Sequence, residues 1–321
     1  MIRNAKNESV MNKPTMNEPT MNKRAMDKRG ITFSVSGIKY YENEYYKNSP
    51  NSFAAVSLTG ADCACRCAHC EGHILKSMKD VSDTGKFISF IDKAVVAGLG
   101  GLLISGGADS SGSVPILPRI DEIAYAKRKG LRIVVHTGLI DPQTARALKS
   151  AGADRVSFDV IGSAKTIRDV YGIDKTPDDY YDSMINCLEV NLPMTPHIVV
   201  GLDFGKIEGE FEAVDMIRRV GARNLVFVVF VPKRGTRMEN APAPLLTEVI
   251  GVFEYAARTL RNARLALGCA RPASYSVELE KAALDLGFDA IAYPHERTIK
   301  RVREEGLEAV FMEECCCLQS D

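Results

Sequence analysis

The sequence contains no tryptophan, no surplus of charge of either sign and no long apolar run. Its 321 residues carry 41 lysines and arginines against 41 aspartates and glutamates, which excludes electrostatic attraction to nucleic acid or to an anionic membrane. No stretch approaches the roughly 18 consecutive apolar residues that cross a bilayer, and the N-terminus lacks the apolar core of a signal peptide. We therefore expect a cytoplasmic protein with no nucleic-acid or membrane partner.

What the sequence does contain is nine cysteines in an otherwise ordinary composition, 45% hydrophobic and 26% charged. That composition excludes a disordered chain or a small disulfide scaffold. In a reducing compartment, clustered cysteines indicate metal binding or catalysis more often than disulfides. Seven of the nine are clustered, in the groups Cys63, Cys65, Cys67, Cys70 and Cys315, Cys316, Cys317, while Cys187 and Cys269 stand alone.

Three segments differ in composition. Residues 1–30 include a five-residue polar repeat, MNKPT MNEPT MNKRA MDKRG, with too little apolar surface to fold, and are expected to form a disordered tail. The hydrophobic patterning of residues 31–300 is typical of one folded domain. Residues 301–321 end in the second cysteine group and are expected to pack as a tail on that domain.

Short apolar runs alternate with segments of helical period from residue 31 onward, which predicts an α/β fold. Units of 30 to 40 residues fit a strand and its return helix, and about eight of them close most naturally into a (β/α)₈ TIM-like barrel. An open doubly wound sheet is the alternative. In either fold, ligands bind at the C-terminal ends of the strands. The eight predicted strands are residues 54–59, 101–105, 132–137, 155–160, 195–202, 224–231, 264–268 and 290–293.

The first cysteine group follows the first of these strands. Cys63, Cys67 and Cys70 form C-x3-C-x2-C, with Cys65 as an extra thiol. Three thiolates on one short loop can hold three irons of a [4Fe–4S] cluster and leave the fourth iron open to a small molecule. A zinc site or reduced structural thiols are the alternatives, although zinc usually takes two chelating pairs.

This motif resembles the signature of the radical S-adenosylmethionine (SAM) superfamily. The resemblance implies that Cys63, Cys67 and Cys70 are the catalytic cluster ligands, that the open iron binds SAM, and that one electron cleaves SAM to a 5′-deoxyadenosyl radical. The residue before the last cysteine, His69, occupies a position that is usually aromatic and lies near the adenine. A low-potential electron donor is implied as a partner.

Further motifs extend the resemblance over residues 50–300, toward the biotin-synthase-like branch. They imply SAM-binding roles for Ser105, Gly106 and Gly107 in a glycine-rich turn, for Asp109 just beyond it, for Ser157 and Asp159 in S-F-D, and for Val199 within HIVVGL. Glycines let a backbone approach a zwitterion closely, and a carboxylate suits the ribose hydroxyls. PKRGT at residues 232–236 resembles that branch's P-x-x-G-T turn.

The sequence differs from biotin synthase itself in one feature that excludes that enzyme. The stretches that would carry its second-cluster cysteines, GLLISGG, RIVVHTG and TPHIVVG, contain no cysteine. Cys269 in GCARP and the terminal Cys315, Cys316 and Cys317 instead offer ligands for an auxiliary iron–sulfur cluster. The alternative is that they are ordinary or loose thiols. Cys187 is expected in the core.

SLTG before the signature, E-G-H after it, GCARP and the Glu-Cys-Cys terminus are similar to the archaeal-type two-protein lipoyl synthase family. This resemblance implies sulfur insertion into an octanoylated lipoyl carrier domain, with a second radical SAM paralogue as partner. Other reactions of the same branch (a mutase, a lyase or cofactor assembly) and a non-catalytic iron–sulfur or zinc protein remain alternatives.

Overall fold

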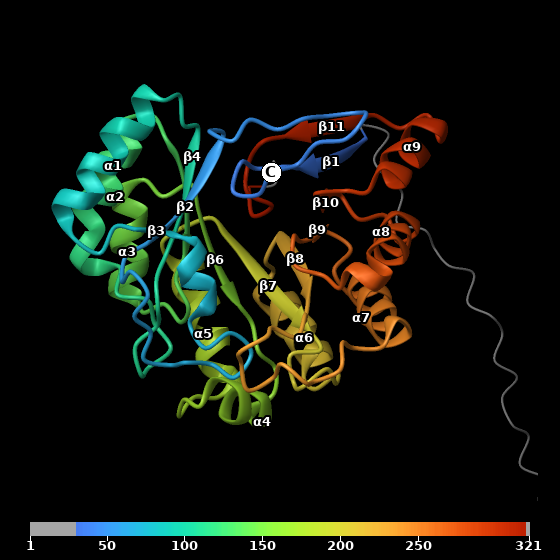
Figure 1. The fold of residues 1–321 in the computed structure, drawn as a ribbon. Helices are drawn as coiled ribbons and strands as arrows, with labels where there is room; N and C mark the ends of the chain where they lie inside the picture. Colours follow the sequence, from blue (N-terminus) through green and yellow to red (C-terminus); the bar gives the residue numbers. More distant parts are fainter. Residues whose placement is uncertain (1–29, 319–321) are drawn as a thin grey trace, which may run out of the picture.

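The computed structural model describes residues 30–318, so nearly all of the expected N-terminal tail lies outside the described residues. Its core is one parallel sheet with helices on its outer side (Figure 1). The strands are β1 (Ile31–Ser34), β2 (Phe53–Ser57), β3 (Lys79–Asp80), β4 (Gly101–Ser105), β5 (Arg132–His136), β6 (Arg155–Asp159), β7 (Met194–Val200), β8 (Asn224–Val229), β9 (Arg264–Leu267), β10 (Ala290–Ala292) and β11 (Ala309–Met312).

The helices follow the strands in alternation, as the predicted strand–helix units require. They are α1 (Thr84–Val96), α2 (Ile120–Arg128), α3 (Pro142–Ala151), α4 (Ala164–Thr166), α5 (Pro177–Glu189), α6 (Glu210–Val220), α7 (Leu246–Thr259), α8 (Ser276–Asp285) and α9 (Glu296–Glu304). None of those in the described chain is long and apolar enough to cross a membrane.

The predicted α/β barrel architecture is confirmed, and all eight predicted strands are present. The strand order is β11-β1-β10-β9-β8-β7-β6-β5-β4-β2-β3, and every pair is parallel. The sheet curls, but no ladder joins β11 to β3, so the curl is not closed by strand pairing within residues 30–318.

The core between sheet and helices is built by alternate residues of the strands. On β6, Val156 and Phe158 are fully buried against the helices, whereas Ser157 and Asp159 point the other way, into the concave side of the curl. The same alternation on β7 places Ile198 outside and His197 inside. Cys187 of α5 is fully buried in the outer core, as predicted.

The chain end fills the inside of the curl. After β11, the described chain turns into the concave side of the sheet (Figure 1). Cys315, Cys317 and Leu318 pack there against Phe53 of β2 and Val134 of β5. Barrel interiors are normally filled by layers of strand side chains. Here a chain terminus fills part of that space, so its thiols line the interior.

Candidate active site

The signature loop directly follows β2 and is joined to the glycine-rich turn after β4. The Leu58 amide donates to the Ser105 carbonyl over 2.7 Å, and the Gly107 amide donates to Thr59 Oγ1 over 2.7 Å. β2 and β4 are paired in register up to Ser57 and Ser105. Two loops far apart in sequence therefore leave the sheet side by side, which is why both predicted motifs meet at one edge.

Gly107 lies where no other residue fits. A Cβ on Gly107 would lie 2.5 Å from the Cα and 2.6 Å from the Cβ of Cys63, and closer still to the carbonyl oxygen of Asp62. Real Cβ atoms do not approach backbone so closely, so the glycine is required by the contact itself. At Gly106 the nearest atom would be a methyl of Thr59 at 3.2 Å, a milder constraint.

Cys67 and Cys70 sit on a tight backbone turn. The amides of Cys70 and Glu71 both donate to the Cys67 carbonyl, over 3.1 and 2.8 Å. Arg66 and Glu71 adopt left-handed backbone angles, with φ of 41° and 45°, a conformation that costs energy for residues other than glycine. This strained turn brings the two thiols together. A hydrogen bond from the Cys67 thiol, then His69, lower the pKa of Cys70 to about 4 despite burial.

His69 is partly buried beside this turn, and its ring lies 5.5 Å from the ring of Tyr171. Its Nδ1 has no hydrogen-bond partner in the described residues. Burial lowers the pKa of His69, but the Cys70 thiolate and the Asp159 charge raise it, and the net change is a rise. The Tyr171 hydroxyl in turn donates to Asp159 Oδ2 over 3.0 Å, so His69, Tyr171 and Asp159 form one connected group.

Two predicted residues make local contacts. The Ser105 hydroxyl donates to the carbonyl of His136 over 3.0 Å. Asp109 Oδ1 accepts from the amides of Ser111 and Ser113 and from the Ser111 hydroxyl, so this carboxylate closes its own loop. The Cys65 thiol lies 2.8 Å from the Asp109 carbonyl oxygen.

The remaining predicted positions line the concave face of β6 and β7. Asp159 is the register partner of His197 on the neighbouring strand, and Ser157 is the partner of Thr195. Val199 lies two residues beyond His197, on the same face of β7 and partly buried. Asp159 influences both His69 beside the signature loop and His197 deeper in the curl. Asp159 and His197 therefore lie on the concave face of the sheet, between the signature loop and the chain end.

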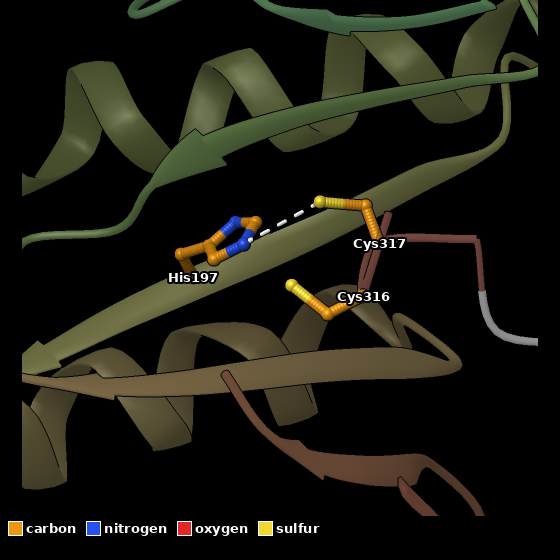
Figure 2. Close-up of side chains that lie close together, drawn as sticks. All are labelled: His197, Cys316 and Cys317. Carbon is orange, nitrogen blue, oxygen red and sulfur yellow. Dashed lines mark hydrogen bonds between the residues drawn. The ribbon is translucent and has the colours of Figure 1, made fainter. Parts of the chain in front are cut away.

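The terminal cysteines lie on the concave side of the curl and contact each other. Cys315 Sγ and Cys317 Sγ are 3.5 Å apart, and Cys317 Sγ is 3.6 Å from His197 Nε2. Figure 2 shows Cys316 and Cys317 reaching toward the His197 ring from the chain end. The Thr195 hydroxyl donates to the Cys317 carbonyl over 2.9 Å, which fixes the depth of the chain end against β7.

Cys269 completes the group from the end of β9. Cys269 is exposed there, and the neighbouring Cys316 thiol lowers the pKa of Cys269. Hydrogen bonds from Cys316 and Cys317 lower the pKa of Cys315, since neighbouring thiols stabilise one thiolate among them. Cys316 thus lies between the exposed Cys269 and the buried Cys315 and Cys317, and all nine cysteines of the chain are free thiols.

The PKRGT turn, residues 232–236, follows β8 and contacts the end of the signature loop. Arg237, directly after this turn, pairs with Glu71 through its Nε at 2.9 Å and also donates its amide to the same carboxylate. A Cβ on Gly235 would lie 2.9 Å from the His73 ring. The E-G-H motif and the P-x-x-G-T turn therefore contact each other.

The sequence analysis assigned no role to three residues that the structure places near the site: His136, Tyr171 and His197. The signal for His197 was present, since it is a histidine inside an otherwise apolar strand. His136 is likewise a histidine next to apolar residues, on β5, and its Nδ1 lies 3.1 Å from Ser157 Oγ.

A family model described as the radical SAM superfamily matches residues 58–220, just over half of the chain. The matched range contains the signature loop, the glycine-rich turn and the interior face of β6 and β7. Cys269 and the terminal cysteines lie outside it. A search of curated proteins finds no match.

Solved structures resemble the chain in fold. Methylornithine synthase superposes with a TM-score of 0.57 and 11% identity, over 88% of this chain and 84% of that one. HydG, a maturase of the [FeFe]-hydrogenase, gives 0.58 and 12% over 84% of this chain, which spans only 58% of HydG. HMG-CoA lyase from Brucella melitensis gives 0.51 and 11% over 89% and 94%. At these identities the likeness is one of fold alone.

Proposed function

The chain belongs to the radical SAM superfamily, and from that premise we propose that it inserts sulfur into an octanoyl chain carried by a lipoyl domain, as one component of a two-protein lipoyl synthase. The observation that carries the proposal is the gathering of Cys315, Cys316 and Cys317 on the concave side of the curl, with Cys269 exposed next to Cys316 at the end of β9. The lipoyl assignment is further supported by the SLTG, E-G-H and GCARP motifs.

The donors fit the two groups that this function needs. Thiolates are the preferred ligands of iron–sulfur clusters, and three on one loop leave one iron of a [4Fe–4S] cluster free for SAM. When bound, the first cluster and SAM supply a hydrogen-abstracting radical, and an auxiliary cluster supplies the sulfur. Carbon–hydrogen bonds of an octanoyl chain have no acidic proton, so acid–base side chains alone could not activate them.

The protein's own residues position and shield these groups. Gly107 brings the glycine-rich turn against the Cys63 backbone, and Tyr171 orients the Asp159 carboxylate. Deeper in the curl, Phe53 and Val134 pack on the chain end and help to bury Cys315 and Cys317. An enclosed site of this kind prevents side reactions of reactive intermediates.

Replacing Asp159 with asparagine should raise the KM for SAM more than it lowers kcat. We propose that this carboxylate binds the ribose hydroxyls, and a hydrogen bond to a charged group contributes about 1.5–3 kcal/mol, which corresponds to a rise of roughly tenfold or more. The matched variant Tyr171→Phe removes the hydroxyl that Asp159 accepts from but keeps the carboxylate, so its effect should be smaller. An unchanged KM in Asp159→Asn would remove Asp159 from the SAM site.

Replacing Cys269 with alanine should leave SAM cleavage intact and abolish sulfur transfer, because Cys269 lies with the terminal thiols and not with the signature loop. The assay measures 5′-deoxyadenosine and the product peptide from the same reaction. The control is Cys187→Ala, whose cysteine is buried in the outer core; it should keep both activities. Unchanged sulfur transfer in Cys269→Ala would contradict the ligand assignment.

The function itself is tested by turnover. Full-length protein reconstituted anaerobically with isotopically labelled sulfide, alone and with its paralogue, is given dithionite, SAM and an octanoylated lipoyl-domain peptide. Labelled sulfur in the octanoyl chain is the expected result. Cleavage of SAM without labelled product would favour another radical SAM reaction of the same branch. Absence of 5′-deoxyadenosine would favour a non-catalytic metal protein.

A further inference from the structure

His197 lies against the terminal thiols in a way that sequence reasoning did not anticipate. The ligand atoms of His197, Cys316 and Cys317 all lie within 4.8 Å of one another. Figure 2 shows the imidazole and both thiols converging from β7 and from the chain end. Imidazole nitrogen and thiolate sulfur together form a donor set that binds zinc and iron in proteins.

Both sides of this group are held in place. His197 is in the middle of β7 and only 8% exposed, and its ring packs edge-on against His136 at 6.0 Å. Cys317 is only 3% exposed, and its carbonyl accepts from Thr195 on the same strand. The geometry therefore does not depend on a loose chain end.

Ordinary packing does not account for the imidazole. Buried polar atoms are nearly always hydrogen-bonded, because burying one without a partner is costly. His197 Nδ1 has no partner among the described residues, and Nε2 faces only a thiol at 3.6 Å, a weak partner. His136 differs, because its Nδ1 is within hydrogen-bond distance of Ser157. A metal bound at Nε2 would replace this weak thiol contact, and it would leave Nδ1 as the donor nitrogen that metal-bound histidines direct to a water or another acceptor.

We propose that His197 Nε2 ligates the same metal centre as Cys316 and Cys317, so that the auxiliary cluster has mixed imidazole and thiolate ligation. This inference rests on the proposed function, which supplies the cluster. A neutral imidazole in place of an anionic thiolate lowers the negative charge of a cluster and raises its reduction potential, as in centres where histidine replaces cysteine. The cluster should therefore accept an electron more readily than an all-thiolate one.

The test isolates the auxiliary cluster. The full chain carrying Cys63→Ala, Cys67→Ala and Cys70→Ala lacks the first cluster. It is produced with histidine labelled with the heavy nitrogen isotope, reconstituted anaerobically and reduced. Pulsed paramagnetic resonance should detect a strong histidine-nitrogen coupling. The coupling should be lost when His197→Gln is added and retained when His136→Gln is added, and His197→Cys, which restores an anionic thiolate, should lower the reduction potential.

The outcomes separate the two proposals. If the triple variant binds no iron, the auxiliary cluster fails and the ligand assignment fails with it. If about four irons are bound but no histidine coupling is seen, His197 is not a ligand while the cluster stands. A coupling that persists in His197→Gln also overturns the assignment. Because the isotope experiment is made with His197 present, poor folding of the substituted protein does not obscure the answer.

Discussion

Replacing Cys70 with alanine should abolish 5′-deoxyadenosine formation, whereas replacing Cys65 should leave it nearly unchanged. Cys70 is the third cysteine of the C-x3-C-x2-C spacing, and its thiolate is stabilised by the Cys67 thiol and by His69, which lower its pKa to about 4. A thiolate, not a thiol, is the metal ligand. Without it, two signature thiols remain, and a cluster held by two ligands would be lost.

Cys65 is the matched control because it lies in the same loop. Its thiol reaches the Asp109 carbonyl and stands outside the signature spacing. Cys70 is a better choice than Cys67 for the loss-of-function variant, since Cys65 adjoins Cys67 through a hydrogen bond and could replace it as a ligand. The measurement is 5′-deoxyadenosine after dithionite reduction, together with iron content. SAM cleavage that survives in Cys70→Ala but fails in Cys65→Ala would reverse the ligand assignment.

Replacing Gly107 with alanine should reduce SAM cleavage by at least roughly tenfold. The added methyl would overlap the Asp62 carbonyl and lie 2.5 Å from the Cys63 Cα. These are backbone atoms, so no side-chain rotation relieves the clash and the signature loop must move away from the turn. Overpacking of this kind typically costs about 1–3 kcal/mol. Because Cys63 is itself a ligand, the displacement acts directly on the cluster.

The control for this prediction is Gly251→Ala in α7. A Cβ at Gly251 would meet no atom within 4 Å, and alanine is favoured over glycine in a helix by up to about 1 kcal/mol. This variant should keep full SAM cleavage and unfold at an equal or higher temperature. Full activity in Gly107→Ala, with the control behaving as expected, would mean that the two loops do not meet as closely as described.

The fold was largely predictable because its signals are local. Each of the eight predicted strands is an apolar run bounded by turns, and all eight are present. The three additional strands, β1, β3 and β11, are two to four residues long, but β9 and β10 are equally short and were predicted, so length alone does not explain the difference. β1 pairs with β10 and β11 from the far end of the chain. Such pairing depends on tertiary contacts and leaves no pattern in the sequence.

The candidate site also has a part that local sequence predicts and a part that depends on tertiary contacts. Cys63, Cys67 and Cys70 lie within eight positions, and spacing alone indicated their chemistry. The meeting of Cys269 with the chain end depends on how β11 leads the tail into the curl. Glu314 pairs with Arg132 on the way, at 3.4 Å, a contact across 182 positions that no spacing rule predicts. The number of cysteines suggested that these thiols act together, but only the folded structure shows that His197 lies next to them.

The most direct test of the account is an iron and sulfide count on anaerobically prepared full-length protein. With two clusters, the chain should hold about eight irons and about eight sulfides, falling to about four of each in Cys316→Ala/Cys317→Ala. SAM cleavage should persist in that variant, because the signature loop is untouched. About four irons in the unsubstituted protein, unchanged by the double substitution, would contradict the auxiliary cluster and the sulfur insertion that depends on it.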